Sequence, residues 1–452
     1  MVKTIPDSDY FERIHRLQAK MAERDLDAVL CYADTGVYEN VFYLSKYWPL
    51  FEVGGVLVGR TGTPLVLIGG EAPEFGGQTP FGMDAVRGCS AFGHTSGPVR
   101  DWIGVTYHSL SELFGEVTGG KGVKRLGLAD YNITPHPLYE QICAAVQPSG
   151  EVIDCGDLLI DLRMNKSAYE QEMVREACLL SQKAFNDALG KIHPDMTEYE
   201  LEGVLAAELY KNGGEGPSFP ILCYSGYRSR SGIGRSTHNK LGRDTLINID
   251  IGCHYAGYAS AYGRPILFGK MPKNKKKEID FMLDLHERLI CEWVKPGMTS
   301  EAVYQKYYDW FVDHGYGPPP ASASHGIGVF EGEPPTFRFN NPTELKPGMT
   351  IAGDQGVRVS IRGLLPDHRD RHRAVHPGQL ALHRALIPNY HPSFLGMAAV
   401  YLHGGHFPNL PQGVETAPCP QSHRPIRLCR ERNGRSTAAC TVTAAYSCSP
   451  VV

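Results

Sequence analysis

The chain has 452 residues, which is too long for one ordinary core and predicts two domains and a further segment. Its formal net charge of −4 and hydrophobic fraction of 42% give no sign of a basic surface for nucleic acid or for an anionic membrane. These values argue against those two classes of partner and favour a protein that acts on small molecules.

The amino-terminal thirty residues form a charged, amphipathic stretch without the apolar run of a signal peptide. No run of eighteen apolar residues follows, so we expect a cytoplasmic protein that does not enter the membrane. The twelve cysteines lack metal-binding spacings such as CxxC, and they are expected to be buried, reduced thiols.

Helical and strand patterns alternate along the first 155 residues or so. A helix is expected near residues 9–24, and strands at 27–32, 54–68, 124–130 and 151–156. This alternation predicts an α/β domain over residues 1–157, with a boundary near residues 157–161.

Two helix starts follow this boundary. Ser167 precedes a long apolar-periodic stretch and has Glu170 three residues later, which is the pattern of a capping box. Thr197 and Glu200 repeat the pattern at the start of a second helix.

The second helix start returns further along the chain. "PDMTEYELEGVLAAELYKNGG" begins at residue 194 and "PGMTSEAVYQKYYDWFVDHG" at residue 296, so that Pro, Met, Thr and a closing Gly recur at a spacing of 102. An internal repeat of this length predicts a pseudo-twofold domain whose halves close over one site. The alternative is that P-x-M-T is simply a common helix start.

The sequence changes character after about residue 354. Residues 356–452 contain eleven Arg and no Lys, only four acidic residues, and no lasting hydrophobic period. We therefore expect an irregular, poorly ordered tail over residues 356–452. A frame change in the gene near residue 356 would explain these features together, and translating the other frames of the genomic DNA tests this hypothesis.

Histidines in the tail have spacings that suit zinc on a helix. His368, His372 and His376 lie four residues apart, and His403 and His406 lie three apart. The surrounding arginines repel a dication, so we favour a compositional accident.

Three stretches bring acids, histidines and glycines together in a fixed order. They are "SGIGRSTHNKLGRDTLINID", with His238 and Asp250, the hairpin "IDIGCHYAGYASAYGRP", and "SASHGIGVFEGEPP", with His325, followed by "LKPGMTIAGD", which ends at Asp354. The hairpin is expected to turn at Gly257 and, if regular, to place Ala261 directly opposite Asp250.

These motifs resemble those of the creatinase, aminopeptidase P and methionine aminopeptidase family, the pita-bread hydrolases. The likeness covers residues 160–355, and the stretch "DLDAVLCY…ENVFYLSKY" is similar to the family's usual amino-terminal domain. The resemblance implies an α/β (α+β) protein, with an α/β creatinase-like domain over residues 1–157 and a pseudo-twofold pita-bread catalytic domain over residues 158–355. It also implies a homodimer.

The resemblance assigns roles to residues of the first two stretches. His238 matches the histidine that touches substrate and that is the general base in the metal-free creatinase branch, a role that suits an imidazole. Asp250 matches the first metal-binding aspartate, but the position of its partner holds Ala261. Asp250 is then expected to hold a cationic substrate group or to be a structural acid.

The third stretch matches the family less fully. His325 corresponds to the metal-binding histidine, whereas Gly332 replaces the second histidine expected seven residues later. Glu331 and Glu333 flank this gap and, with Arg264, are candidate substrate-binding residues, although "EGEPP" is more typical of a solvated loop.

The carboxylate side of the expected site is incomplete. Asp354 stands where the family has a glutamate, and no match to the family's final acid is found. We therefore expect catalytic roles for His238, Asp250, His325 and Asp354 and no resident cofactor. The alternative is one Mn, Zn or Co ion at Asp250, His325 and Asp354.

Three functions remain open at this point. The leading hypothesis is a metal-independent, creatinase-like hydrolase that cleaves a carbon–nitrogen bond in a small polar or cationic substrate, with His238 as general base. The first alternative is a metal-dependent Xaa-Pro dipeptidase or aminopeptidase P-like peptidase that acts on dipeptide-like substrates. The second is a catalytically impaired relative that serves as a binding or dimerisation module.

Overall fold

The structure is a computed structural model that describes residues 3–70, 73–92, 105–230, 233–270, 273–319, 322, 324–353 and 399–401. The chain divides into two compact units. The first unit comprises residues 1–177, 254–260 and 326–335, and the second comprises residues 178–253, 261–325 and 336–452. The domain ranges expected from the sequence stay a prediction.

A mixed sheet forms the centre of the first unit, with the strand order β5-β4-β3-β2-β1-β6-β7. β2 pairs antiparallel with β1 and β3, whereas the other neighbours run parallel. The strands are β1 (Ala28–Ala33), β2 (Gly54–Gly59), β3 (Leu65–Ile68), β4 (Val86–Cys89), β5 (Tyr107–His108), β6 (Arg125–Leu128) and β7 (Glu151–Asp154).

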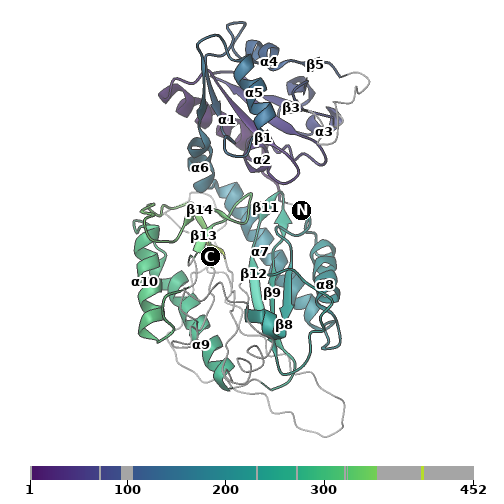
Figure 1. Ribbon diagram of the computed structural model, residues 1–452, viewed down its shortest axis with the longest axis vertical. Coiled ribbons are helices and arrows are strands. Elements are labelled where there is room, and N and C mark those ends of the chain that lie inside the picture. Colours follow the sequence, from purple (N-terminus) through teal and green to yellow (C-terminus); the bar gives the residue numbers. More distant parts are fainter. Residues whose placement is uncertain are drawn as a thin grey trace, which may run out of the picture. The chain divides into compact units, whose positions relative to one another are not determined.

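Helices pack on this sheet (Figure 1). Leu30 on β1 joins the apolar core under α4 and α5, and its neighbours Val29 and Cys31 are also fully buried, so both faces of β1 are covered. The helices of the first unit are α1 (Asp7–Glu23), α2 (Glu39–Ser45), α3 (Pro73–Gly76), the 3₁₀ turn η1 (Met83–Ala85), α4 (Leu110–Val117), α5 (His136–Ala145) and α6 (Gly156–Met164).

The expected α/β pattern of the first 155 residues is confirmed, with two differences. Residues 54–68 form the two strands of a hairpin rather than one strand, because Gly62 has φ 84° and turns the chain between them. The expected boundary at residues 157–161 lies inside α6.

The second unit contains a three-stranded antiparallel sheet of order β12-β9-β8 beside α8 and the second part of α7 (Figure 1). Strands β13, β15 and β16 belong to a four-stranded sheet of order β14-β13-β15-β16. The elements between residues 168 and 267 are α7 (Ala168–Leu189), α8 (Glu198–Lys211), β8 (Leu222–Ser225), the 3₁₀ turn η2 (Gly226–Arg230), β9 (Leu246–Ile251), β10 (His254–Tyr255), β11 (Tyr258–Ala259) and β12 (Tyr262–Leu267). Those that follow are α9 (Lys273–Arg288), the π-helix η3 (Leu289–Trp293), α10 (Ser300–Asp313), β13 (Ser324–Gly326), β14 (Glu333–Thr336), β15 (Thr350–Gly353) and β16 (Ala399–Tyr401).

The internal repeat is present in the structure as two copies of one backbone arrangement, here named the first repeat (residues 194–251) and the second repeat (residues 296–353). In the first repeat, the amide of Leu241 donates to Met196 O at 2.9 Å, and Thr197 forms an isolated bridge with Lys240. In the second repeat, the amide of Leu345 donates to Met298 O at 2.8 Å, and Thr299 bridges with Glu344. The recurring P-x-M-T segment is therefore structural and not an accident of helix starts.

The expected helix caps are also found. Thr197 and Glu200 form a reciprocal capping box on α8. Ser167 and Glu170 make the same pair of contacts at the start of α7, at 3.2 and 2.8 Å. Thr299 caps α10 through the amide of Ala302.

The hairpin after β9 turns at Ala256 and Gly257, both with positive φ, as expected. The expected pairing of Asp250 with Ala261 is wrong, because the residue opposite Asp250 is Gly263. Tyr255 pairs with Tyr258 across the turn, and this tight two-residue connection sets the register two residues further along than expected.

The expected tail is described only at residues 399–401, which form β16 and pair antiparallel with β15. This short strand differs from the fully irregular tail that the composition predicts. The tail histidines and the rest of residues 356–452 lie outside the described residues. Within the described part of the chain, no helix is long and apolar enough to cross a membrane.

Candidate functional site

Asp250 lies on the face of the β8–β9–β12 sheet that is turned away from α7 and α8. Ile249 and Ile251 pack in the core with these helices, so the alternation of β9 points Asp250 to the opposite face. Its side chain is fully buried, and Tyr224 Oη donates to Asp250 Oδ2 at 3.4 Å. A buried carboxylate therefore lies on the face of this sheet opposite α7 and α8.

Tyr224 remains a hydrogen-bond donor to this carboxylate. Burial, together with the charge of Asp250 and the hydrogen bond to it, raises the pKa of Tyr224 well above its usual value. The phenol is consequently protonated at physiological pH and can donate its proton to the hydrogen bond with Asp250.

Ala261 immediately precedes β12 and is two residues before Gly263, the partner of Asp250. Residues two apart on a strand share a face, so a side chain at position 261 is a diagonal neighbour of Asp250, about 7 Å away. The corrected register therefore leaves position 261 on the face of Asp250, where Ala261 supplies no ligand.

Arg264 does not share this face. It lies opposite Ile249 on the helix-covered side, stacks at 4.4 Å on the ring of Tyr262, and donates to Gly263 O at 2.6 Å. The structure therefore does not bring the predicted substrate-binding Arg264 to the side of Asp250.

His238 lies in the loop between η2 and β9 and is exposed. Its ring contacts that of Tyr199 edge-on, with 4.9 Å between the ring centroids. The imidazole is therefore accessible to solvent, and the role of His238 in substrate contact stays a prediction.

His325 is half-buried in the middle of β13, between the fully buried Ser324 and the glycine Gly326. Asp354 directly follows β15 and lies outside the described residues. Asp250 and His325 are carried by strands of two different sheets, β9 and β13.

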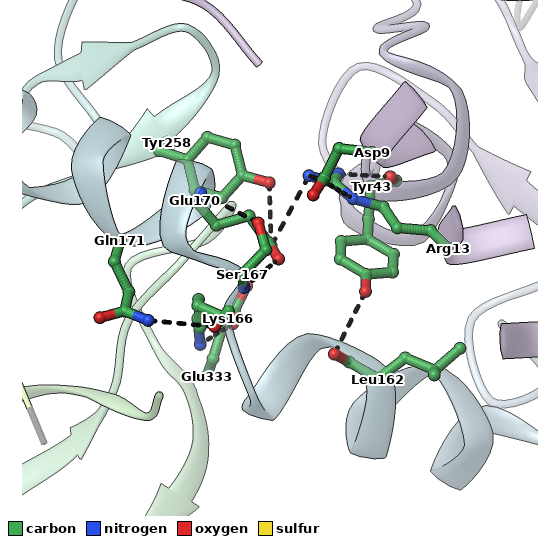
Figure 2. Close-up of polar contacts among 10 residues, drawn as sticks. All are labelled: Asp9, Arg13, Tyr43, Leu162, Lys166, Ser167, Glu170, Gln171, Tyr258 and Glu333. Atoms are coloured by element: carbon green, nitrogen blue, oxygen red, sulfur yellow. Dashed lines mark hydrogen bonds and ion pairs between the residues drawn. The ribbon is translucent and has the colours of Figure 1, made fainter. Parts of the chain in front are cut away.

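Glu331 and Glu333 belong to the first unit. Glu331 is half-buried, and Glu333 is 3% exposed and forms ion pairs with Arg163 at 2.6 Å and Lys166 at 3.1 Å (Figure 2 shows Lys166 and Glu333). Burial opposes ionisation, but these two cations hold the pKa of Glu333 at about 2. The expectation of a solvated loop is wrong at Glu333, because this side chain is engaged in buried ion pairs.

A second buried polar cluster lies nearby in the first unit (Figure 2). Tyr258 Oη, from the hairpin tip, donates to Glu170 Oε1 at 3.0 Å, and Arg13 approaches the same oxygen at 4.0 Å. Arg13 also pairs with Asp9 at 2.6 Å and lies over the ring of Tyr43. This cluster ties α1, the start of α7 and the hairpin tip together.

The donors present do not complete a metal centre within the described residues. A carboxylate and an imidazole, from Asp250 and His325, suit a divalent ion, but Ala261 offers no donor. The structure, over the residues it describes, holds no group of three His, Cys, Asp or Glu side chains that could bind a metal. These residues therefore do not fit a two-metal centre.

Sequence reasoning overlooked Glu198, the first residue of α8. It is fully buried and accepts hydrogen bonds from the loop that carries His238. The only available signal was an acid directly after the N-cap Thr197, where the second repeat has Ser300 after Thr299.

Two family models match the chain in succession. Residues 13–165 match the creatinase/prolidase N-terminal domain, and residues 172–364 match metallopeptidase family M24. The second match extends eight residues beyond residue 356, where the composition changes, and ends at residue 364.

The chain is 26% identical over 350 residues to the Xaa-Pro dipeptidase of Pyrococcus horikoshii, covering 77% of this chain and 90% of that protein. It is 31% identical over 209 residues to the Xaa-Pro dipeptidase of Pyrococcus furiosus, covering 46% of this chain and 60% of that protein. Its fold is similar to the crystal structure of the prolidase from Pyrococcus horikoshii OT3, with a TM-score of 0.66 and 21% identity over 87% of this chain and 95% of that chain.

These comparisons change two expectations. They do not support the metal-independent creatinase-like function, and the peptidase alternative fits them better. A family of metallopeptidases also agrees better with a bound divalent ion than with the absence of a cofactor. The homodimer and the cytoplasmic location stay predictions.

Proposed function

Because the chain belongs to metallopeptidase family M24 and carries a creatinase/prolidase amino-terminal domain, we propose that it is a Xaa-Pro dipeptidase-like hydrolase. The observation that carries this proposal is the similarity to a Xaa-Pro dipeptidase along 90% of that protein, through both matched domains. The substrate class is a dipeptide with proline in the second position.

One divalent ion per chain is the metal content that the donors favour. Asp250 and His325 would hold this ion, with Asp354 as a third ligand. A second ion would need a further ligand at position 261, where alanine has no donor atom in its side chain. When bound, such an ion polarises a carbonyl and lowers the pKa of bound water.

The protein side chains then bind and orient the dipeptide. His238 is exposed and lies against Tyr199, and we assign it the contact with the substrate next to the scissile bond. Asp250 accepts a hydrogen bond from the Tyr224 hydroxyl, and its carboxyl group offers oxygen ligands to a cationic partner on the face of the sheet opposite α7 and α8.

Hydrolysis of paired dipeptides tests this function. The full-length chain is assayed with Ala-Pro and with Ala-Ala, each with added Mn²⁺ and with a chelator. We expect cleavage of Ala-Pro that exceeds cleavage of Ala-Ala at least tenfold and that the chelator abolishes. Equal cleavage of both dipeptides, or chelator-resistant cleavage of Ala-Pro, would contradict the proposal.

A second candidate is supported by Ala261 and Gly332, two positions at which the family resemblance expects ligating or substrate-contacting side chains. In this case the chain binds Xaa-Pro dipeptides but does not cleave them. Binding of Ala-Pro by calorimetry, without turnover and with loss of binding in His238→Ala, would favour this candidate.

A further inference from the structure

Glu198 is a buried carboxylate whose partners all come from the segment that leads to His238. Its Oε1 accepts from the amide of Ser225 at 2.8 Å and from Ser225 Oγ at 3.2 Å. Its Oε2 accepts from the amide of Thr237 at 2.9 Å, from Thr237 Oγ1 at 2.7 Å, and from Arg228. The side chain of Glu198 therefore bonds Ser225, at the start of this segment, and Thr237, directly before His238.

The backbone reinforces this attachment on both sides of His238. The amide of Tyr199 donates to Thr237 O at 3.2 Å, and the amide of Glu198 donates to Asn239 O at 2.9 Å. The residues before and after His238 are thus bonded to the first turn of α8, while the imidazole itself is exposed against Tyr199.

The second repeat shows which of these contacts the scaffold alone requires. There, the amides of Ser300 and Glu301 donate to Thr343 O at 2.9 Å and to Asn341 O at 3.1 Å, which reproduces the backbone bonds. The side chain of Ser300, at the position of Glu198, donates only to Asn341 O at 2.6 Å. The fold therefore forms this junction without a buried charge.

A buried carboxylate is costly unless hydrogen bonds and a counter-charge compensate for its lost hydration. The first repeat has this costly carboxylate beside the loop that carries His238. In the second repeat the residue that corresponds to His238 is Pro342, because Asn341 and Thr343 on either side of it make the matching backbone bonds. The difference between the repeats coincides with the residue that is expected to touch substrate.

We propose that Glu198 is a positioning residue, which fixes the described loop residues 225–229 and 233–239 so that the imidazole of His238 is presented to the substrate. A rigid support reduces the entropy that the loop loses when substrate binds. The effect on catalysis rests on the proposed function, whereas the effect on loop order does not.

The test compares Glu198→Ala and Thr237→Val with the matched control Ser300→Ala in the full-length chain. Thr237→Val keeps the shape of the side chain and removes only its hydroxyl, so it guards against a Glu198→Ala variant that fails to fold. Hydrogen exchange is measured by mass spectrometry on peptides from both repeats, and KM and kcat are measured with Ala-Pro.

We expect backbone exchange in residues 226–239 to rise about tenfold in Glu198→Ala and less in Thr237→Val, with the second repeat unchanged. Ser300→Ala should leave residues 226–239 unchanged. KM for Ala-Pro should rise about tenfold in Glu198→Ala, with a smaller fall in kcat.

Unchanged exchange in residues 226–239, or an equal rise in both repeats, would overturn the proposal, since Glu198 would then have no local role or only a general one in stability. An unchanged KM beside a loosened loop would also overturn it. Absence of turnover in the unaltered chain would refute the proposed function, and the exchange pattern would still decide whether Glu198 fixes the loop.

Discussion

In the first repeat Leu241 donates its amide to Met196, and in the second repeat Leu345 does the same to Met298. The scaffold residues recur because each repeat needs the same bridge at the same helix end. The side chains proposed to act at the site do not recur, since Ser300 takes the place of Glu198 and Pro342 that of His238. Residues that recur in both repeats therefore serve the backbone geometry, and residues that differ between the repeats are candidates for function.

The largest expected effect concerns the buried glutamates of the two repeats. Glu198 has one arginine partner, Arg228, whereas Glu333 forms ion pairs with both Arg163 and Lys166. We expect Glu333→Gln to lower the free energy of unfolding by about 3–5 kcal/mol, because it leaves two buried cations without an anion. Chemical denaturation at pH 7 measures this loss.

The ionisation of Glu333 makes the free energy of unfolding depend on pH. Its pKa falls from 4.5 to about 2 on folding, so the stabilisation is complete above about pH 4.5 and is lost as the pH falls toward 2. The Glu333→Gln variant should lack this part of the pH dependence. An equal acid slope in both proteins would contradict the lowered pKa of Glu333 in the folded chain.

Leu241 and Leu345 provide a matched pair that tests the shared scaffold. Both side chains are buried, at 1% and 0% exposure, and each follows the bridge of its repeat. Leu241→Ala and Leu345→Ala should each lower the free energy of unfolding by about 2–5 kcal/mol. Thermal and urea unfolding measure the stability of both variants. A negligible loss of stability in either variant would contradict the structural equivalence of the two repeats.

Ala261→Asp tests whether the hairpin of β9 and β12 still has the geometry for a pair of acids. The new carboxylate is expected on the face of Asp250, and we expect Mn²⁺ to bind about tenfold more tightly, or by about 1.4 kcal/mol. Isothermal titration measures this change. The matched control Ala256→Asp places an acid in the turn and should leave the affinity unchanged.

The smallest effect distinguishes the two helix caps. Thr197→Ala removes a capping box that includes Glu200, whereas Thr299→Ala removes a cap whose third position is Ala302. Both changes should cost about 1 kcal/mol, with the larger loss at Thr197. A larger loss at Thr299 in urea unfolding would contradict the assignment of the reciprocal box.

Much of the fold follows from local patterns in the sequence. The capping pairs at Ser167 and Thr197 and the turn at Gly257 depend on nearby residues, and the structure confirms them. The predicted partner of Asp250 across the hairpin was wrong by two residues, because the pairing of β9 with β12 depends on how the residues at the hairpin tip pair.

The site was less accessible to sequence reasoning. Glu198 and Glu333 acquire their environments from partners that lie 27 to 39 and 167 to 170 positions away in the chain. No local pattern indicates such contacts. Asp354, which ends the stretch that resembles the family, lies outside the described residues.

The number of divalent ions bound per chain tests the account most directly. Purified full-length protein is saturated with Mn²⁺, dialysed and measured by elemental analysis, together with its hydrolysis of Ala-Pro. We predict one ion per chain and hydrolysis of Ala-Pro that depends on this ion. Two ions per chain, or hydrolysis by a chain that holds none, would contradict this prediction.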